Sequence, residues 1–171
     1  MKSYHDIKNF SDWSKTEKDQ YSIKVIKGLV MDATRKANSG HPGGTMSCAD
    51  FAYILYHDYL NFDPRNHEWF NRDRFVLSGG HMSMLQYSLL LLIGWLGMDD
   101  IESFRQLHSR TPGHPEVEIP GVECTTGPLG QGFAMGVGMA HAEAYLHNLF
   151  RSLAEEAGQL VDHYTYVLAS D

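Results

Sequence analysis

The sequence predicts an α/β fold in which a parallel sheet is flanked by helices. Two short apolar segments are expected to be strands. Residues 74–78 are bounded by Gly79 and Gly80, as a buried parallel strand would be, and residues 164–169 form the second segment. The segments before and between them show mainly helical periodicity. Strands that alternate with helices imply crossover connections and therefore a parallel sheet. The 171 residues are enough for one domain with its own core.

The composition is that of an ordinary globular protein and excludes several function classes. Hydrophobic residues make up 43% of the chain and charged residues 20%. The formal net charge of -7 argues against a general nucleic-acid binder, which usually presents a basic face. The first residues are polar, and no apolar run is long enough to span a bilayer. We therefore expect no contact with nucleic acid or membrane. The two cysteines, Cys48 and Cys124, lie far apart and match no metal spacing, which favours a reduced, cytoplasmic setting.

The chain is expected to start with an arm, residues 1–15, followed by one domain over residues 16–171. Thr16 and Asp19 have the spacing of a capping box, which predicts a helix start. The helix then places one apolar face toward the core and ends at residues 38–40, where Asn, Ser and Gly follow one another. That face consists of Ile26, Val30, Ala33 and Ala37.

Three further helices are predicted before the central turn. The first is capped by Ser47, follows a loop at residues 42–44 and ends at residues 61–64. Its core-facing residues are expected to be Phe51, Ile54, Leu55 and Tyr59. The second, residues 82–95, is apolar nearly all round and should be buried. The third opens at Asp99, with Glu102 completing a capping box, and runs through Leu107.

A long helix is predicted over residues 128–157, ended by Gly158. Pro128 suits its first turn, where the missing N–H would have had no partner. Small residues recur on it every four positions, at Gly132, Gly136, Ala140 and Ala144. This stripe favours close packing against a neighbouring element over any chemical role.

Three of the ten histidines lie in loops stiffened by glycine or proline: His41, His81 and His114. A histidine fixed in this way can transfer a proton near neutral pH or hold a phosphate or hydroxyl oxygen. A purely structural role stays open for each. The other histidines are expected to be structural or at the surface. No short zinc motif is present, so a dedicated zinc site is not expected.

The segment from Gly121 to Gly132 reads as a glycine-lined turn that opens the long helix. A helix start presents free N–H groups and partial positive charge, which suit a phosphate or diphosphate. Gly127, Gly130 and Gly132 would let a ligand come close to the backbone. A tight turn with no ligand is an equally good reading of these residues alone.

Taken together and in order, the three histidine loops and this turn resemble the amino-terminal, cofactor-diphosphate-binding domain of transketolases. The resemblance covers residues 22–171 and implies the thiamine diphosphate-binding fold, incomplete within this chain. Members of the family hold thiamine diphosphate through a divalent metal. They transfer a two-carbon ketol unit from a ketose phosphate to an aldose phosphate.

The resemblance also implies roles for individual residues. His41 and His114 would be catalytic and face the substrate. Cofactor-binding positions would be His81, Gly127, Pro128, Leu129 and Asp171. Asp171 would also bind the metal, Mg²⁺ or Ca²⁺, since both prefer hard oxygen ligands. Ser170 departs from the family, which usually has glycine there.

The chain ends at Asp171, inside the family's metal-binding motif. We therefore expect it to need the remaining transketolase domains or a C-terminal subunit, in a homodimer or heterotetramer. It would act on phosphorylated sugars in the pentose phosphate pathway, with no turnover alone. The alternatives are a related thiamine diphosphate enzyme, either dihydroxyacetone synthase or deoxyxylulose-phosphate synthase, and a non-catalytic truncated interaction module.

Overall fold

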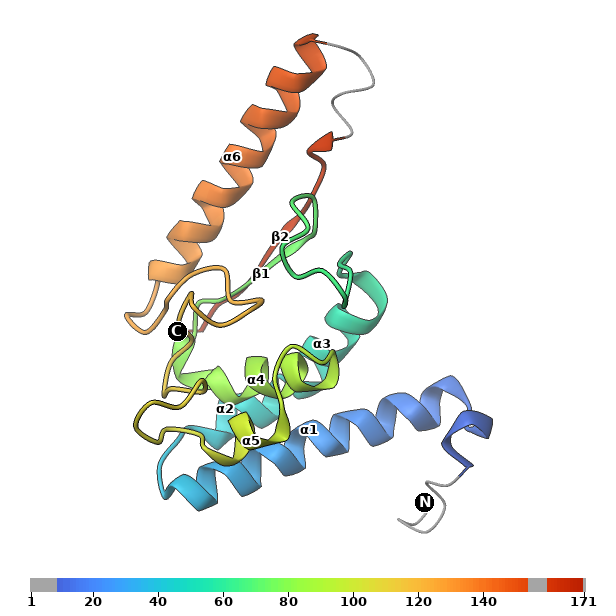
Figure 1. The fold of residues 1–171 in the computed structure, drawn as a ribbon, viewed down its shortest axis with the longest axis vertical. Helices are drawn as coiled ribbons and strands as arrows, with labels where there is room; N and C mark the ends of the chain where they lie inside the picture. The colour runs from blue at the N-terminus through green and yellow to red at the C-terminus, as the bar shows by residue number, and fades with distance from the viewer. Residues whose placement is uncertain (1–8, 154–159, 171) are drawn as a thin grey trace.

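The computed structural model describes residues 9–153 and 160–170. Its elements are α1 (Lys15–Ala37), α2 (Pro42–Ser47), α3 (Ala49–Ile54), the π-helical turn η2 (Leu55–Tyr59), β1 (Arg74–Leu77), the 3₁₀ turn η3 (Gly80–Met82), α4 (Ser83–Leu92), α5 (Met98–Glu102), α6 (Gln131–Leu153) and β2 (Thr165–Leu168). β1 and β2 pair in parallel, with Arg74 opposite Thr165 and Leu77 opposite Leu168. The predicted α/β fold class with a parallel sheet is thereby confirmed. In Figure 1, α6 runs along one side of the strands and α1 to α5 gather on the other.

The core is built around α4, which is buried on every side from Ser83 to Leu90. One part of its surface packs with β1, where Leu85 and Leu89 meet Phe75 and Leu77. Another part packs against α1 and the residues around α5. The prediction of a buried helix here is confirmed, because a helix that is apolar all round has no face suited to water.

The first helix is capped two residues before the predicted capping box. Ser14 caps α1: the Glu17 N–H donates to Ser14 Oγ, and the Ser14 N–H donates to the Glu17 carboxylate at 2.9 Å. The predicted Thr16–Asp19 box is wrong, because the Asp19 carboxylate accepts hydrogen bonds from Lys15 and Tyr53 instead. The predicted apolar face is largely correct, since Ile26, Val30 and Ala33 are buried.

The predicted helix after residue 47 has a different start, and its buried face agrees with the prediction at Leu55 and in part at Ile54. The chain is already helical from Pro42, and Cys48 separates α2 from α3. Phe51 and Tyr59, predicted to face the core, are 58% and 68% exposed. The break at Cys48 and the π-helical turn η2 shift the register, so the buried residues are Ala49, Ala52, Tyr53, Leu55 and Tyr56.

Helix α5 is shorter than predicted. It ends at Glu102, and Leu107, the predicted last residue, is 87% exposed. The predicted Asp99–Glu102 capping box is also wrong. Asp100 caps the helix instead, because its carboxylate accepts the Gly97 N–H at 2.8 Å. The chain then leaves the helix, and Arg105 adopts a left-handed backbone conformation with φ of 60°.

Helix α6 packs closely on the strands through the first half of the predicted small-residue stripe. A Cβ on Gly132 would lie 2.7 Å from Ser78 Cα, and one on Gly136 would lie 2.4 Å from Val167 Cγ2. Ala140 and Ala144 are exposed, so the stripe prediction is wrong for them. The reason is length: the 23-residue helix α6 spans roughly 34 Å, whereas the four-residue strand β2 spans only about 13 Å. The helix therefore extends beyond the strand on which it packs.

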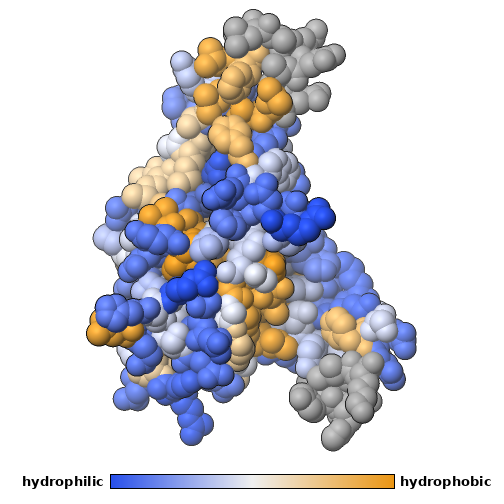
Figure 2. Space-filling view, in the orientation of Figure 1, coloured by the Kyte–Doolittle hydropathy of each residue, from blue (hydrophilic) through white to orange (hydrophobic). Residues whose placement is uncertain are grey.

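The outer surface of α6 carries exposed apolar side chains, which include Phe133, Val137 and Leu149. Figure 2 shows apolar side chains gathered over the protruding end of this helix. The predicted helix end at Gly158 falls outside the described residues. A membrane-crossing helix needs a long apolar stretch, and no helix in the described part of the chain has one.

Candidate functional site

The carboxyl end of the sheet brings three separate loops into contact. Gly79 and Gly80 follow β1, and Ser170 follows β2. A Cβ on Gly79 would lie 2.7 Å from Ser170 Oγ. A Cβ on Gly80 would lie 2.7 Å from Thr126 Oγ1 and 2.9 Å from the Gly127 nitrogen. At Gly80 the obstacle is the Gly127 backbone, so only glycine fits there and the loop after β1 lies directly against the 121–132 turn.

The three predicted histidines gather at the same edge. The rings of His41 and His81 are 5.2 Å apart between centroids and meet edge to face. His114 lies beside the turn, because a Cβ on Gly127 would be 3.6 Å from His114 Cδ2. His41 and His114 are exposed and His81 is half-buried, so all three side chains can reach a ligand.

Buried polar groups of α4 hold the loop that carries His114. Ser83 Oγ donates to the Gly113 carbonyl at 2.9 Å. Tyr87 Oη lies 3.0 Å from the Pro112 carbonyl and 3.1 Å from the His114 carbonyl. A buried hydroxyl needs such a partner, and each of these bonds also fixes the loop backbone. Sequence reasoning missed both residues, although a polar side chain inside an apolar helix is a usable signal.

The turn before α6 is anchored to β1 in the same way. The buried Thr126 hydroxyl donates to the Leu77 carbonyl at 2.8 Å, and Ser78 Oγ accepts the Phe133 N–H at 3.0 Å. Helix α6 begins at Gln131, so the predicted start at Pro128 is wrong. Gly130 has φ of 84°, which turns the chain before the helix can begin.

Arg105 joins two of the histidine loops, and sequence reasoning did not identify it. Its Nη1 donates to Ser39 Oγ at 2.6 Å, just before His41. Its guanidinium also flanks the loop before His114, since a Cβ on Gly113 would lie 3.1 Å from Arg105 Nε. The residue fell inside a predicted helix, and its link to Ser39 depends on the tertiary fold.

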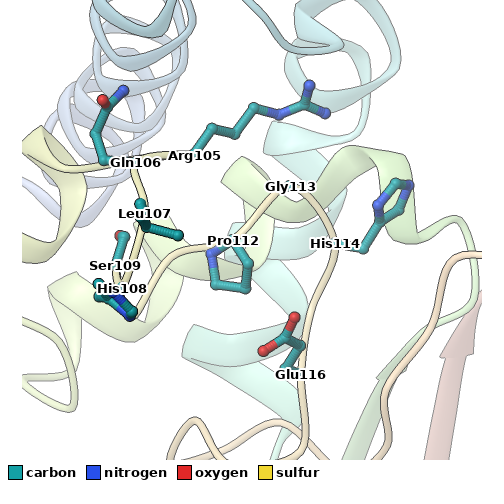
Figure 3. Close-up of a pocket in the computed structure, with 9 residues that line it drawn as sticks. All are labelled: Arg105, Gln106, Leu107, His108, Ser109, Pro112, Gly113, His114 and Glu116. Atoms are coloured by element: carbon teal, nitrogen blue, oxygen red, sulfur yellow. The ribbon is translucent and has the colours of Figure 1, made fainter.

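A cavity of about 690 Å³ opens beside His114. Its lining residues are Arg105, Gln106, Leu107, His108, Ser109, Pro112, Gly113, His114 and Glu116. Figure 3 shows Arg105, His114 and Glu116 projecting from different parts of this lining. A volume of this size is in the range of small-molecule binding sites. The lining carries a positively charged side chain, Arg105, and a negatively charged one, Glu116.

The environment of His114 favours its neutral form. Although His114 is exposed at the surface, partial desolvation by the surrounding protein lowers its pKa below the ordinary value, and the positive charges of Arg105, His41 and His81 lower the pKa further. A neutral imidazole near pH 7 can accept a proton or a hydrogen bond from a substrate hydroxyl.

The residues at this edge fit a diphosphate. Two glycines of the turn have open space beside them, because a Cβ on Gly130 would meet nothing within 4 Å and one on Gly127 would meet only the His114 ring. Gly132, expected to let a ligand approach as well, packs on Ser78 instead. The turn leads into the amino end of a long helix. Ser170 Oγ is buried there and has no hydrogen-bond partner among the described residues. Gly127 is half-buried, while Pro128 and Leu129 are exposed. Asp171, the expected metal ligand, lies outside the described residues.

Comparison with known proteins gives a consistent match. Residues 18–171 match the family described as "Transketolase, thiamine diphosphate binding domain". The transketolase of Staphylococcus epidermidis is 55% identical over 156 residues, which are 91% of this chain and 23% of that protein. The chloroplastic transketolase of Solanum tuberosum is 54% identical over 88% of this chain and 20% of its own length.

Solved structures agree with the sequence matches. A transketolase from Leishmania mexicana superposes with a TM-score of 0.85 at 45% identity, covering 90% of this chain and 23% of that one. A Pichia stipitis transketolase in complex with sedoheptulose 7-phosphate gives a TM-score of 0.82 at 45% identity, covering 90% and 22%. The chain thus spans less than a quarter of the length of these relatives, and it belongs to the transketolase family, matching its thiamine diphosphate-binding domain.

Proposed function

We propose that this chain supplies the diphosphate-binding loops and part of the substrate-binding surface of a transketolase. The observation that carries the proposal is the meeting of His41, His81, His114 and the Gly127 turn at the carboxyl end of the sheet. In open α/β sheets, ligands bind at this edge. The reaction is the transfer of a ketol unit from a ketose phosphate to an aldose phosphate. The Pichia stipitis neighbour was solved with a sugar phosphate of this class.

Thiamine diphosphate, when bound, supplies the carbanion chemistry of the reaction. The chain's own residues then need only position the ligands and move protons. His81 lies in the turn after β1 and would hold the diphosphate together with the Gly127 turn, Pro128 and Leu129. His41 and His114 would face the substrate hydroxyls and carbonyl, and a neutral His114 is ready to accept a proton.

Asp171 would hold the divalent metal, Mg²⁺ or Ca²⁺, that accompanies the diphosphate. A carboxylate is a suitable ligand for either ion, because both prefer oxygen donors. Asp171 directly follows Ser170, and Ser170 contacts Gly79 at the same edge of the sheet. The metal would therefore lie on the same side of the sheet as His81.

The exposed apolar side chains of α6 support the need for partners. Apolar surface of this kind usually marks an interface. We assign it to the remaining transketolase domains or a C-terminal subunit, within a homodimer or heterotetramer. The setting would be the pentose phosphate pathway in the cytoplasm.

Calorimetric titration of the chain with thiamine diphosphate and Mg²⁺ tests the proposal, together with a ketol-transfer assay. The chain alone should bind more weakly than micromolar and show no turnover. Mixing it with the complementary part of a transketolase should produce ketol transfer, and profiling donor and acceptor sugars would identify the substrates. Micromolar binding with turnover by this chain alone would refute the need for partners. No binding and no complementation would refute the proposed function.

A further inference from the structure

A second group of chemically active side chains lies at the opposite edge of the sheet. Glu143 and His147 project from α6, and Asp162 lies shortly before β2. One ligand atom from each residue lies within 4.8 Å of the others. Asp162 precedes the amino end of β2, whereas the loops of the proposed cofactor site follow the carboxyl ends of the strands. The two sites are therefore separate.

Two of the three side chains are positioned by the helix itself. Residues four apart lie on the same helical face, so Glu143 and His147 are neighbours along α6. The third is held by a backbone contact, because the Asp162 N–H donates to Asn71 Oδ1 at 2.7 Å. The group is thus set in place by elements that exist without any ligand.

The hydrogen bonding of His147 prepares it to bind a metal. Its Nδ1 donates to the Val161 carbonyl at 2.8 Å, and Val161 is fully buried. A neutral histidine that donates through Nδ1 keeps its lone pair on Nε2. Metal-binding histidines almost always use one ring nitrogen in this way, which fixes the ring and its tautomer.

The negative charges of Glu143 and Asp162 would be stabilised by a bound cation. Two carboxylates lie close together, and like charges at this distance repel each other. Within residues 9–153 and 160–170, neither Glu143 nor Asp162 forms an ion pair with a lysine or arginine. A bound metal ion would neutralise both.

We propose that Glu143, His147 and Asp162 form a binding site for a divalent transition metal of the zinc class. One imidazole nitrogen and two carboxylate oxygens suit Zn²⁺ better than Mg²⁺ or Ca²⁺, which prefer oxygen alone. Water would complete four-coordination. The ion would cross-link α6 to the segment that leads into β2, which is a structural role. This role is independent of the proposed cofactor site. The absence of a short zinc motif predicts no dedicated zinc site, but it does not bear on a group that joins Glu143 and His147 to Asp162, which is distant in the sequence.

Zinc titration of the chain in competition with a chromophoric chelator tests the site, without thiamine diphosphate or Mg²⁺. We expect one tight equivalent of Zn²⁺, and at least about tenfold weaker binding in His147→Gln and in Asp162→Asn. His141→Gln is the matched control, since His141 is an exposed histidine on the same helix, and it should bind like the unchanged chain. Co²⁺ in the site should show the strong visible absorption of four-coordinate geometry.

Three results would overturn the proposal. The first is equal weakening in His141→Gln and His147→Gln, and the second is unchanged binding in both site variants. The third is displacement of Zn²⁺ by Mg²⁺ at comparable concentration, which would mean that the nitrogen ligand is not used. Circular dichroism checks folding. Should His147→Gln not fold, Asp162→Asn at an exposed position decides the question.

Discussion

The chemistry of His114 is set by its neighbours. Burial is the largest cause of its lowered pKa, followed by Arg105 and then by His41 and His81. Glycine and proline around the three histidines were enough to predict that each has a fixed position. The sequence does not show which residues hold the His114 loop in place. These residues are Arg105, Ser83 and Tyr87, and their role depends on contacts with residues distant in the chain.

We predict that NMR titration will place the pKa of His114 below the ordinary value of 6.5. Arg105→Gln should raise the pKa only part of the way back, because burial remains. Between the folded and unfolded pKa values of His114, the unfolded chain binds more protons than the folded chain, so lowering the pH favours unfolding. The His114 contribution to stability is therefore lost as the pH falls below about 6.5. A His114 pKa above 6.5, or one that falls in Arg105→Gln, would contradict this explanation.

The division of roles between two histidines can be tested in an enzyme reconstituted with this chain. His81→Ala should weaken cofactor affinity, because His81 is half-buried in the turn after β1. His114→Ala should lower turnover of ketose donors with cofactor affinity nearly unchanged, because His114 lies at the cavity. Equal losses of affinity and turnover at both positions would refute the division.

At the level of elements, both strands and the buried helix α4 were predictable, because each is an apolar segment bounded by clear turn signals. The bounds of α2 and α3 were not predictable. The break at Cys48 and the π-helical turn change the helical period, and the buried face changes with it. Both capping boxes were misplaced by two residues, because several acidic residues compete for each helix start.

The packing of α6 on the sheet gives a stability prediction. Gly136→Ala should destabilise the chain by about 1–3 kcal/mol, because its Cβ would lie 2.4 Å from Val167 Cγ2. Gly138→Ala is the matched control on the same helix: its Cβ would meet nothing within 4 Å, and it should stabilise by about 0.5–1 kcal/mol. Urea unfolding of both variants measures the difference. Equal effects would mean that α6 does not rest on β2 at this position.

For the whole molecule, the sequence was sufficient to predict the fold class and the meeting of loops at one edge of the sheet. The carboxyl ends of parallel strands share an edge, so residues that follow them must come close together. The cluster of Glu143, His147 and Asp162 could not be predicted in this way. It joins a helix to a loop from a distant part of the chain, and no local pattern marks it.

The most direct test of the proposed cofactor site is NMR of the ¹⁵N-labelled chain titrated with thiamine diphosphate and Mg²⁺. The amide signals of Gly79, Gly80 and Gly127 and the ring signals of His81 should shift. Thiamine without its diphosphate should shift these signals much less, and the amide signal of Asp162, at the other end of the strands, should not shift. Shifts centred on Asp162, or no shifts at Gly79, Gly80 and Gly127 at millimolar cofactor, would contradict the site.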